Sequence, residues 1–182
     1  GVSYTTSEAV EVYYHTLRVP KGGEYRIVLS DGTEVWLNSE SELKFPTVFT
    51  GGKREVELRG EGYFSVARNG HQPFIVVASG VRTKVYGTEF NVKAYAGNQV
   101  DVTLVEGKVA VKQAGDGSEY PLAPGENAHF AEGMAPLIEK VNVHKYIAWK
   151  EGYFYYENER MEVIVNDLKR WYDFDVGYVG SG

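Results

Sequence analysis

The first three quarters of the chain consist of short runs in which apolar and polar residues alternate. An alternation with a period of two is typical of β-strands that bury one face. Residues 25–29 and 34–37 follow this pattern and are separated by the Ser-Asp-Gly-Thr sequence at 30–33. Since Asp-Gly between two alternating runs is a strong hairpin signal, the sequence predicts two antiparallel strands here.

Further runs with strand character continue to about residue 131: residues 55–59, 63–67, 74–78, 82–86, 89–95, 100–105, 108–112, 119–122 and 127–131. Turn residues rich in Gly separate them, and we assign the Gly-Glu-Gly sequence at 60–62 to one such turn. Strands that recur about every 8–12 residues are typical of all-β folds. The predicted fold is therefore mainly β, an antiparallel twisted β-solenoid or a sandwich.

The pattern changes after Pro136. Residues 153–156 and 174–179 each predict a short strand, and Asn158 is a candidate N-cap. Between them, apolar residues recur at steps of three or four and predict a helix with one buried stripe: Met161, Ile164, Val165, Leu168 and Trp171. The polar residues of this segment are expected to face water or a partner: Arg160, Glu162, Asp167, Lys169 and Arg170. The sequence thus predicts a small C-terminal βαβ lobe.

Charge and composition exclude several classes of protein. The net charge of −6 disfavours a nucleic-acid partner, because binding to phosphates needs a basic surface. The absence of Cys excludes disulfides, thiolate metal sites and a Cys nucleophile. No apolar run approaches the roughly 18 residues that a membrane-spanning helix needs.

The sequence holds no catalytic or metal-binding motif that stands out. The four His residues, at 15, 71, 129 and 144, are scattered and have no second ligand type at metal-binding spacing. We therefore expect no metal, no cofactor and no catalytic centre.

An alternative from another class is an extracytoplasmic carbohydrate-binding module or a fragment of a glycoside hydrolase. The chain is rich in aromatic residues, and exposed Trp36 or Trp149 could stack on sugar rings. Pairs of Glu two residues apart, such as Glu55 and Glu57, share one strand face and could serve a glycosidase. Such pairs are also common on the solvated face of a sheet.

Seven blocks in one order resemble the FecR-type domain. The first, at residues 18–25, is Arg-Val-Pro-Lys-Gly-Gly-Glu-Tyr, and the second, at 29–38, is Leu-Ser-Asp-Gly-Thr-Glu-Val-Trp-Leu-Asn. The others lie at residues 54–66, 73–76, 85–92, 102–109 and 122–126. The resemblance covers about residues 18–130. From Trp149 onward the chain resembles the C-terminal domain attached to such proteins, which is similar to the short N-terminal signalling domain of secretins and TonB-dependent receptors.

This resemblance implies the periplasmic part of an anti-sigma factor anchored in the inner membrane. Such a protein relays a signal from the signalling domain of an outer-membrane TonB-dependent transporter to an extracytoplasmic-function sigma factor. The sigma factor would bind a cytoplasmic part, and the membrane would be crossed by a helix, both outside this chain. The expected organisation is a linker after a removed membrane segment at 1–12, a FecR-like all-β domain at 13–140 and part of the C-terminal βαβ lobe at 141–182.

The C-terminal lobe is the expected partner-binding surface. Two short strands leave unpaired edges, which invite a strand from another chain. The residues assigned to this surface are Tyr153, Phe154, Tyr155, Tyr156, Arg160, Lys169 and Arg170.

The resemblance also raises self-cleavage, since some relatives cut themselves at a Gly-Thr bond and Gly87-Thr88 lies in the matching block. A Thr hydroxyl can attack the preceding carbonyl to give an ester that water hydrolyses. The alternative is a tight bend between two strands.

Overall fold

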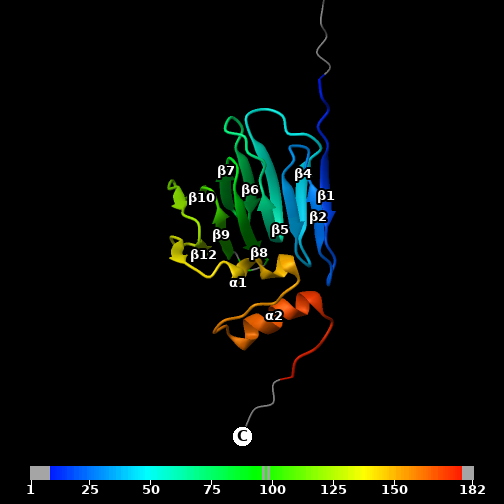
Figure 1. The fold of residues 1–182 in the computed structure, drawn as a ribbon, viewed down its shortest axis with the longest axis vertical. Coiled ribbons are helices and arrows are strands. Elements are labelled where there is room, and N and C mark those ends of the chain that lie inside the picture. Colours follow the sequence, from blue (N-terminus) through cyan, green and yellow to red (C-terminus); the bar gives the residue numbers. More distant parts are fainter. Residues whose placement is uncertain (1–8, 96, 98, 178–182) are drawn as a thin grey trace, which may run out of the picture.

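The computed structural model describes residues 9–95, 97 and 99–177, which form two facing sheets with helical segments at one end (Figure 1). The first sheet holds, in spatial order, β1 (Tyr14–Arg18), β4 (Glu42–Pro46), β5 (Arg54–Ser65), β6 (Phe74–Ala78), β7 (Val81–Val85), β10 (Val109–Gln113) and β11 (Tyr120–Leu122). The second holds β2 (Tyr25–Val28), β3 (Glu34–Leu37), β5 again, β8 (Glu89–Ala94), β9 (Val100–Glu106), β12 (Glu126–Phe130) and β13 (Leu137–Lys140). The prediction of a mainly β fold is confirmed, and of the two expected architectures, a twisted β-solenoid or a sandwich, the two facing sheets correspond to the sandwich.

The pairing of strands is antiparallel with one exception. β5 and β6 run parallel, with Val56 opposite Val76. The segment between them must therefore return along the sandwich before β6 begins. The predicted hairpin at residues 25–37 is confirmed, because β2 pairs antiparallel with β3 and Leu29 N–H donates to the Thr33 carbonyl at 2.8 Å.

The core lies between the two sheets and is filled by the inward-facing residues of the alternating runs. Phe64 on β5 stacks on Phe90 of β8 with ring centroids 5.2 Å apart, and contacts Phe74 of β6 at 6.2 Å. All three rings are fully buried. The period-two pattern therefore identifies the buried face correctly.

The assignment of residues 60–62 to a turn is wrong. They lie inside β5, a single strand whose first half pairs with β4 and β6 and whose second half pairs with β3 and β8. Gly60 stands at the change of sheet with φ of 89°, so the strand bends there without ending. A Gly that permits such a bend gives the same sequence signal as a turn.

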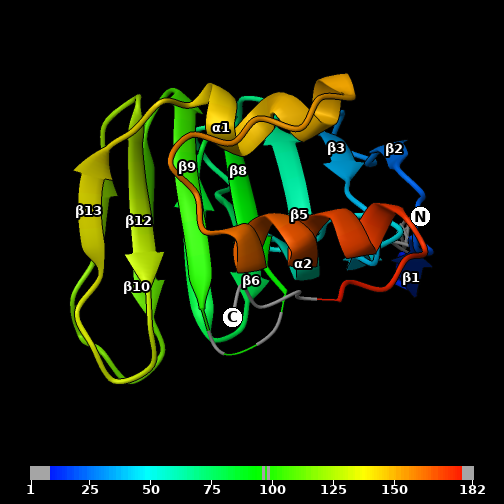
Figure 2. The same ribbon diagram turned by 90° about the horizontal axis from the view of Figure 1, so that it is seen from below.

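The C-terminal part is helical and lies across one end of the sandwich (Figure 2). It comprises α1 (His144–Ile147), the 3-10 helix η1 (Ala148–Glu151) and α2 (Met161–Trp171). The two predicted strands are wrong for the described residues: 153–156 and 174–177 form no strand, and residues 178–179 of the second lie outside the description. Asn158 is not the N-cap, a position that Arg160 holds without a side-chain cap.

Helix α2 is confirmed, but its orientation differs from the expectation. No residue of α2 is buried, and Met161 at its start is 64% exposed. Asp167 and Arg170 face the sandwich rather than water. Within the described part of the chain, no helix has the length and apolarity needed to cross a membrane.

Candidate functional site

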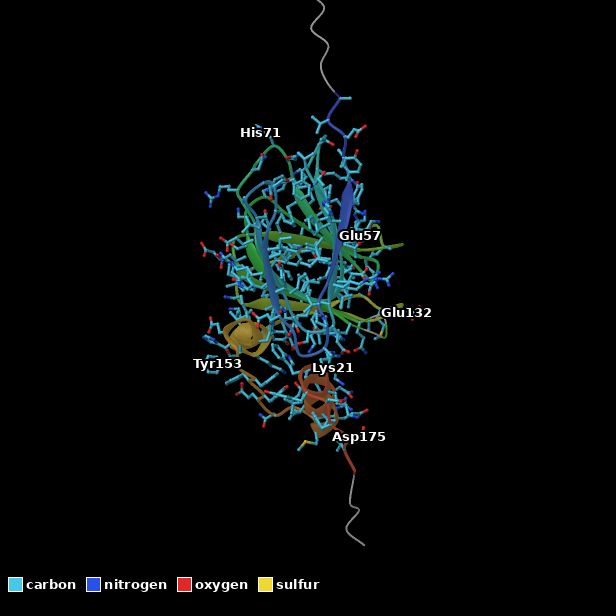
Figure 3. All side chains as sticks on the ribbon, turned by 90° about the vertical axis from the view of Figure 1, so that its right-hand side faces the viewer. Lys21, Glu57, His71, Glu132, Tyr153 and Asp175 are labelled. Carbon is cyan, nitrogen blue, oxygen red and sulfur yellow. The ribbon has the colours of Figure 1, made fainter. Side chains whose placement is uncertain are left out.

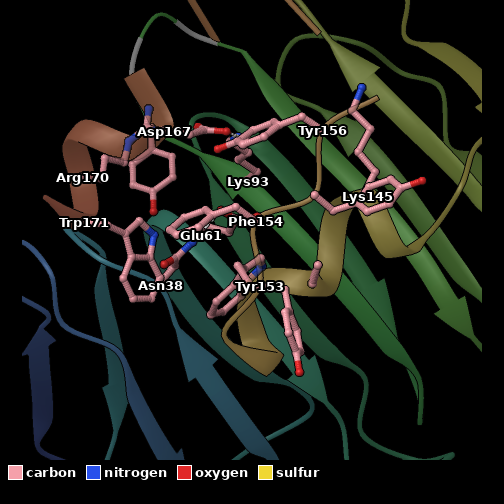
Figure 4. Close-up of a pocket in the computed structure, with 14 residues that line it drawn as sticks. Asn38, Glu61, Lys93, Lys145, Tyr153, Phe154, Tyr156, Asp167, Arg170 and Trp171 are labelled. Carbon is pink, nitrogen blue, oxygen red and sulfur yellow. Dashed lines mark hydrogen bonds and ion pairs between the residues drawn. The ribbon is translucent and has the colours of Figure 1, made fainter. Parts of the chain in front are cut away.

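The junction between the sandwich and the C-terminal segment gathers polar and aromatic side chains around one pocket (Figure 4). Its residues come from β5, β8, the loop after β3, η1 and α2. Two open clefts, of about 620 and 410 Å³, flank it on the side of α2. We call the following set the junction: Asn38, Glu61, Asn91, Lys93, Tyr95, Trp149, Asp167 and Arg170.

Glu61 is the buried centre of the junction. Its side chain projects from β5, and the residue is only 5% exposed. Oε2 accepts a hydrogen bond from Asn38 Nδ2 at 3.1 Å, and Oε1 accepts one from Asn91 Nδ2 at 2.9 Å. Burial raises the pKa of Glu61, while the charge of Lys93 and the two amides oppose that shift.

The two amides that face Glu61 are fixed in orientation by their other contacts. Asn38 Oδ1 accepts from the Ser39 N–H at 2.8 Å, and Asn91 Oδ1 accepts from Trp149 Nε1 at 3.2 Å. Because each amide presents its NH₂ group to Glu61, both carboxylate oxygens must act as acceptors. The Trp149 bond also ties η1 to the sandwich.

Side-chain contacts connect α2 with the sandwich: Lys93 of β8 pairs with Asp167, and Arg170 stacks on Tyr95. Lys93 Nζ lies 3.1 Å from Asp167 Oδ1, and Arg170 Nη1 lies 2.6 Å from the same oxygen. Burial lowers the pKa of Lys93, but the charges of Glu61 and Asp167 more than offset it, so that pKa is raised. The Arg170 guanidinium stacks on the Tyr95 ring, with Cζ 3.7 Å from the ring centre.

We predict that Glu61 makes the stability of the fold fall as pH rises above about 4.5. The folded chain takes up this proton at a higher pH than the unfolded chain, whose Glu has an ordinary pKa near 4.5. The stabilising contribution is therefore present below that value and is lost as pH rises through the raised pKa.

Denaturant unfolding of the wild type and of Glu61→Gln at a series of pH values measures this effect. The difference in unfolding free energy, wild type minus variant, should decrease toward neutral pH. Because the other carboxylates occur in both proteins, they cancel in the difference. Parallel pH profiles would contradict the assignment.

The predicted partner-binding residues lie along the C-terminal segment, and the structure brings some of them together. Phe154 packs edge-on against Trp171, with ring centroids 5.5 Å apart. Tyr153 and Arg160 are exposed, and Tyr155 is 41% exposed.

The other three predicted residues are half-buried: Tyr156, Lys169 and Arg170. Burial raises the pKa of Tyr156 to about 12. Arg170 is engaged within the chain, by Asp167 and Tyr95.

Gly87 and Thr88 lie between β7 and β8. Thr88 is 5% exposed, and its hydroxyl donates to the Lys108 carbonyl at 2.9 Å. A carbonyl oxygen does not remove a proton, and the described hydrogen bonds of this hydroxyl include no basic group. This geometry favours the structural role of Thr88 over self-cleavage.

The aromatic side chains proposed as a sugar platform are engaged within the protein. Trp149 is buried, and Lys150 lies over the rings of Trp36 and Tyr63. Arg26 also lies over Trp36. Glu55 and Glu57 pair with Arg82 and Lys44, so they behave as a solvated strand face.

The sequence search missed Glu61, Lys93 and the inward role of Asp167. Glu61 lies between two Gly residues, and this pattern led to the assignment of residues 60–62 to a turn. No local signal marks it, because Glu61 is one of five charged residues in β5, and only its burial creates the need for a partner. The residues that satisfy it are 23 to 30 positions away in sequence, so their identity depends on tertiary structure.

The fold and the site define a mainly β protein with a polar junction under its C-terminal helical segment. Among residues 9–95, 97 and 99–177, no group of three or more His, Cys, Asp or Glu residues could hold a metal ion. The described histidines are dispersed, and His71 lies at the end of the sandwich opposite α2 (Figure 3).

The family described as "FecR protein" matches residues 15–110, and the chain belongs to this family. Two crystal structures of a candidate anti-sigma factor from Parabacteroides distasonis, at 2.50 and 1.65 Å resolution, are similar to it. Both share 32% sequence identity with the chain, with TM-scores of 0.81 and 0.80. The matches cover 88% and 86% of this chain, and 75% and 74% of the other. No curated protein matches. The family is regulatory, and its membership supports a sensor that regulates a sigma factor.

Proposed function

We propose that the chain is the periplasmic sensor part of an anti-sigma factor anchored in the inner membrane. It relays a signal from the signalling domain of an outer-membrane TonB-dependent transporter to an extracytoplasmic-function sigma factor. Family membership supports the regulation of a sigma factor. That the signal comes from a TonB-dependent transporter and that the chain lies in the periplasm are proposed in addition.

The observation that carries the proposal is the exposed aromatic surface of the C-terminal segment. Tyr153 is 68% exposed, and Tyr172 is 56% exposed. Phe154 is 39% exposed and lies beside Tyr172, with ring centroids 6.2 Å apart. Exposed aromatic side chains that lie together on a surface are typical of a protein-binding site.

The backbone of residues 154–156 offers a second binding feature. It belongs to no helix or strand, and it makes no backbone hydrogen bond with another described residue. An incoming strand could therefore pair with it without displacing a bond already made. The neighbouring face of α2 would then be covered by the side chains of that strand.

The test is titration calorimetry with the isolated N-terminal signalling domain of a TonB-dependent transporter encoded in the same genome. The wild type should bind, and Tyr155→Pro should lose binding because proline has no N–H for the incoming strand. Tyr155→Ala is the matched control, which keeps the N–H and should retain part of the affinity. The thermal midpoints of both variants should stay close to the wild type.

Two results would count against the proposal. Folded Tyr155→Pro that binds as tightly as the wild type would exclude strand pairing at this segment. If every transporter signalling domain of that genome fails to bind the wild type, the proposed partner is wrong.

A further inference from the structure

The C-terminal segment is attached to the sandwich by buried contacts at η1 and by partly exposed contacts in the residues that follow η1. Trp149 of η1 is 7% exposed, and its indole N–H donates to Asn91 at 3.2 Å. Lys150 adds a contact to the Tyr63 ring at 4.8 Å. These contacts fix η1 to the second sheet.

The chain leaves this anchor through a glycine. Gly152 closes η1 in the left-handed region, at φ of 82°, and a side chain there would meet nothing within 4 Å. A glycine with open surroundings permits the following segment to change direction. We call residues 153–172, which follow it, the strap.

The contacts that hold the strap are polar. Lys93 pairs with Asp167, Arg170 stacks on Tyr95, and the Gly22 N–H donates to the Arg170 carbonyl at 2.9 Å. Toward the anchor, Glu159 pairs with Lys145 of α1 at 2.7 Å. The side chains of Asp167 and Arg170 are each 22% exposed, so these interactions are open to solvent and to salt.

The apolar residues of α2 do not supply a comparable attachment. Trp171 lies within about 40° of Asp167 around the helix and lines the junction, but it is only half-buried. Ile164 and Leu168 are also half-buried, and no residue of the strap is fully buried. Burial of apolar surface, the main source of stable packing, is therefore small where the strap meets the sandwich.

We propose that the strap is a releasable element, hinged at Gly152 and held closed over the sandwich by Asp167 with Lys93 and by Arg170 with Tyr95. The chain then has two states, with the strap docked or released, while the sandwich stays folded. A ligand or partner that binds one state better than the other shifts this equilibrium. Both states are properties of this chain by itself, whichever partner it binds.

Hydrogen exchange measured by mass spectrometry on the 182-residue chain tests it. Asp167→Asn removes the charge that holds both cations, so the amides of the strap should exchange about tenfold faster. Exchange in β5 and β8 should not change. Asp175→Asn is the matched control, because it makes the same chemical change at an exposed residue four positions past α2. In this control variant the amides of the strap should exchange at the wild-type rate.

A salt series on the wild type gives a second measurement that needs no variant. Raising NaCl from about 0.02 to about 1 M should speed exchange in the strap, because the pairs are partly exposed. Equal exchange of the strap in Asp167→Asn and the wild type would overturn the proposal. So would a parallel loss of protection in β5 and β8, since strap and sandwich would then open as one unit. A strap that does not respond to salt would also overturn it.

Discussion

Replacing Arg54 with methionine should lower the free energy of unfolding by about 3–5 kcal/mol, because it leaves buried polar groups without their partner. Arg54 begins β5 and is 1% exposed. Its Nη1 donates to Asp31 Oδ2 at 2.8 Å and to the Ala67 carbonyl at 2.7 Å. Its Nε donates to the Gln72 carbonyl at 2.9 Å.

These bonds tie three separate segments of the chain together. Asp31 lies in the turn between β2 and β3, where it also accepts from the Thr33 N–H. Ala67 and Gln72 belong to the connection that makes β6 parallel to β5. A methionine would fill part of the volume, but it would leave the Asp31 carboxylate without its cation and the Ala67 and Gln72 carbonyls without this donor.

Denaturant unfolding of Arg54→Met and of a matched control measures this loss. Arg82→Met removes an arginine from β7 of the same sheet, where the pair with Glu55 is partly exposed, and should change stability by less than about 1 kcal/mol. The double variant Asp31→Asn with Arg54→Met should lose less than the sum of the two single variants, because the two residues interact directly. A loss for Arg54→Met no larger than that for Arg82→Met would show that Arg54 is not structural.

Gly60→Ala should destabilise the sandwich by about 3 kcal/mol or more, because two effects act together. The φ of 89° at Gly60 is unfavourable for any residue with a Cβ. In addition, that Cβ would lie 2.4 Å from Ser41 Oγ and 2.8 Å from Ser41 Cα. Since a backbone atom is among these neighbours, a change of side-chain rotamer cannot remove the clash.

Gly51→Ala is the control that separates the two effects. Gly51 has a similar φ of 80°, but a Cβ there meets nothing within 4 Å. It should lose about 1–2 kcal/mol, from backbone strain alone. Thermal or denaturant unfolding of the two variants then gives the contribution of the Ser41 contact as a difference. Equal losses would mean that β5 and the loop after β3 can move apart at no cost.

The sequence predicted local elements of the fold but not the pairing of segments that are distant in sequence. The hairpin at residues 25–37 was predicted because its signal is local: two alternating runs and an Asp-Gly turn. β1 and β4 were not identified as strands, since their pairing with each other joins distant residues such as Leu17 and Leu43. The strand expected at residues 153–156 has suitable residues, but no described strand pairs with it.

The pattern of apolar residues determined by itself that the chain is mainly β, which faces of the strands are buried, and that residues 161–171 form a helix. These properties follow from periodicity, which depends on near neighbours. Tertiary structure decided the rest. It made one bent strand of the two predicted on either side of Gly60, and it buried Glu61 there beside Asn38 and Asn91. It also turned Asp167 and Arg170 of α2 toward the sandwich, because the partners of a charged side chain are set by which distant segments meet, and a local pattern carries no record of that.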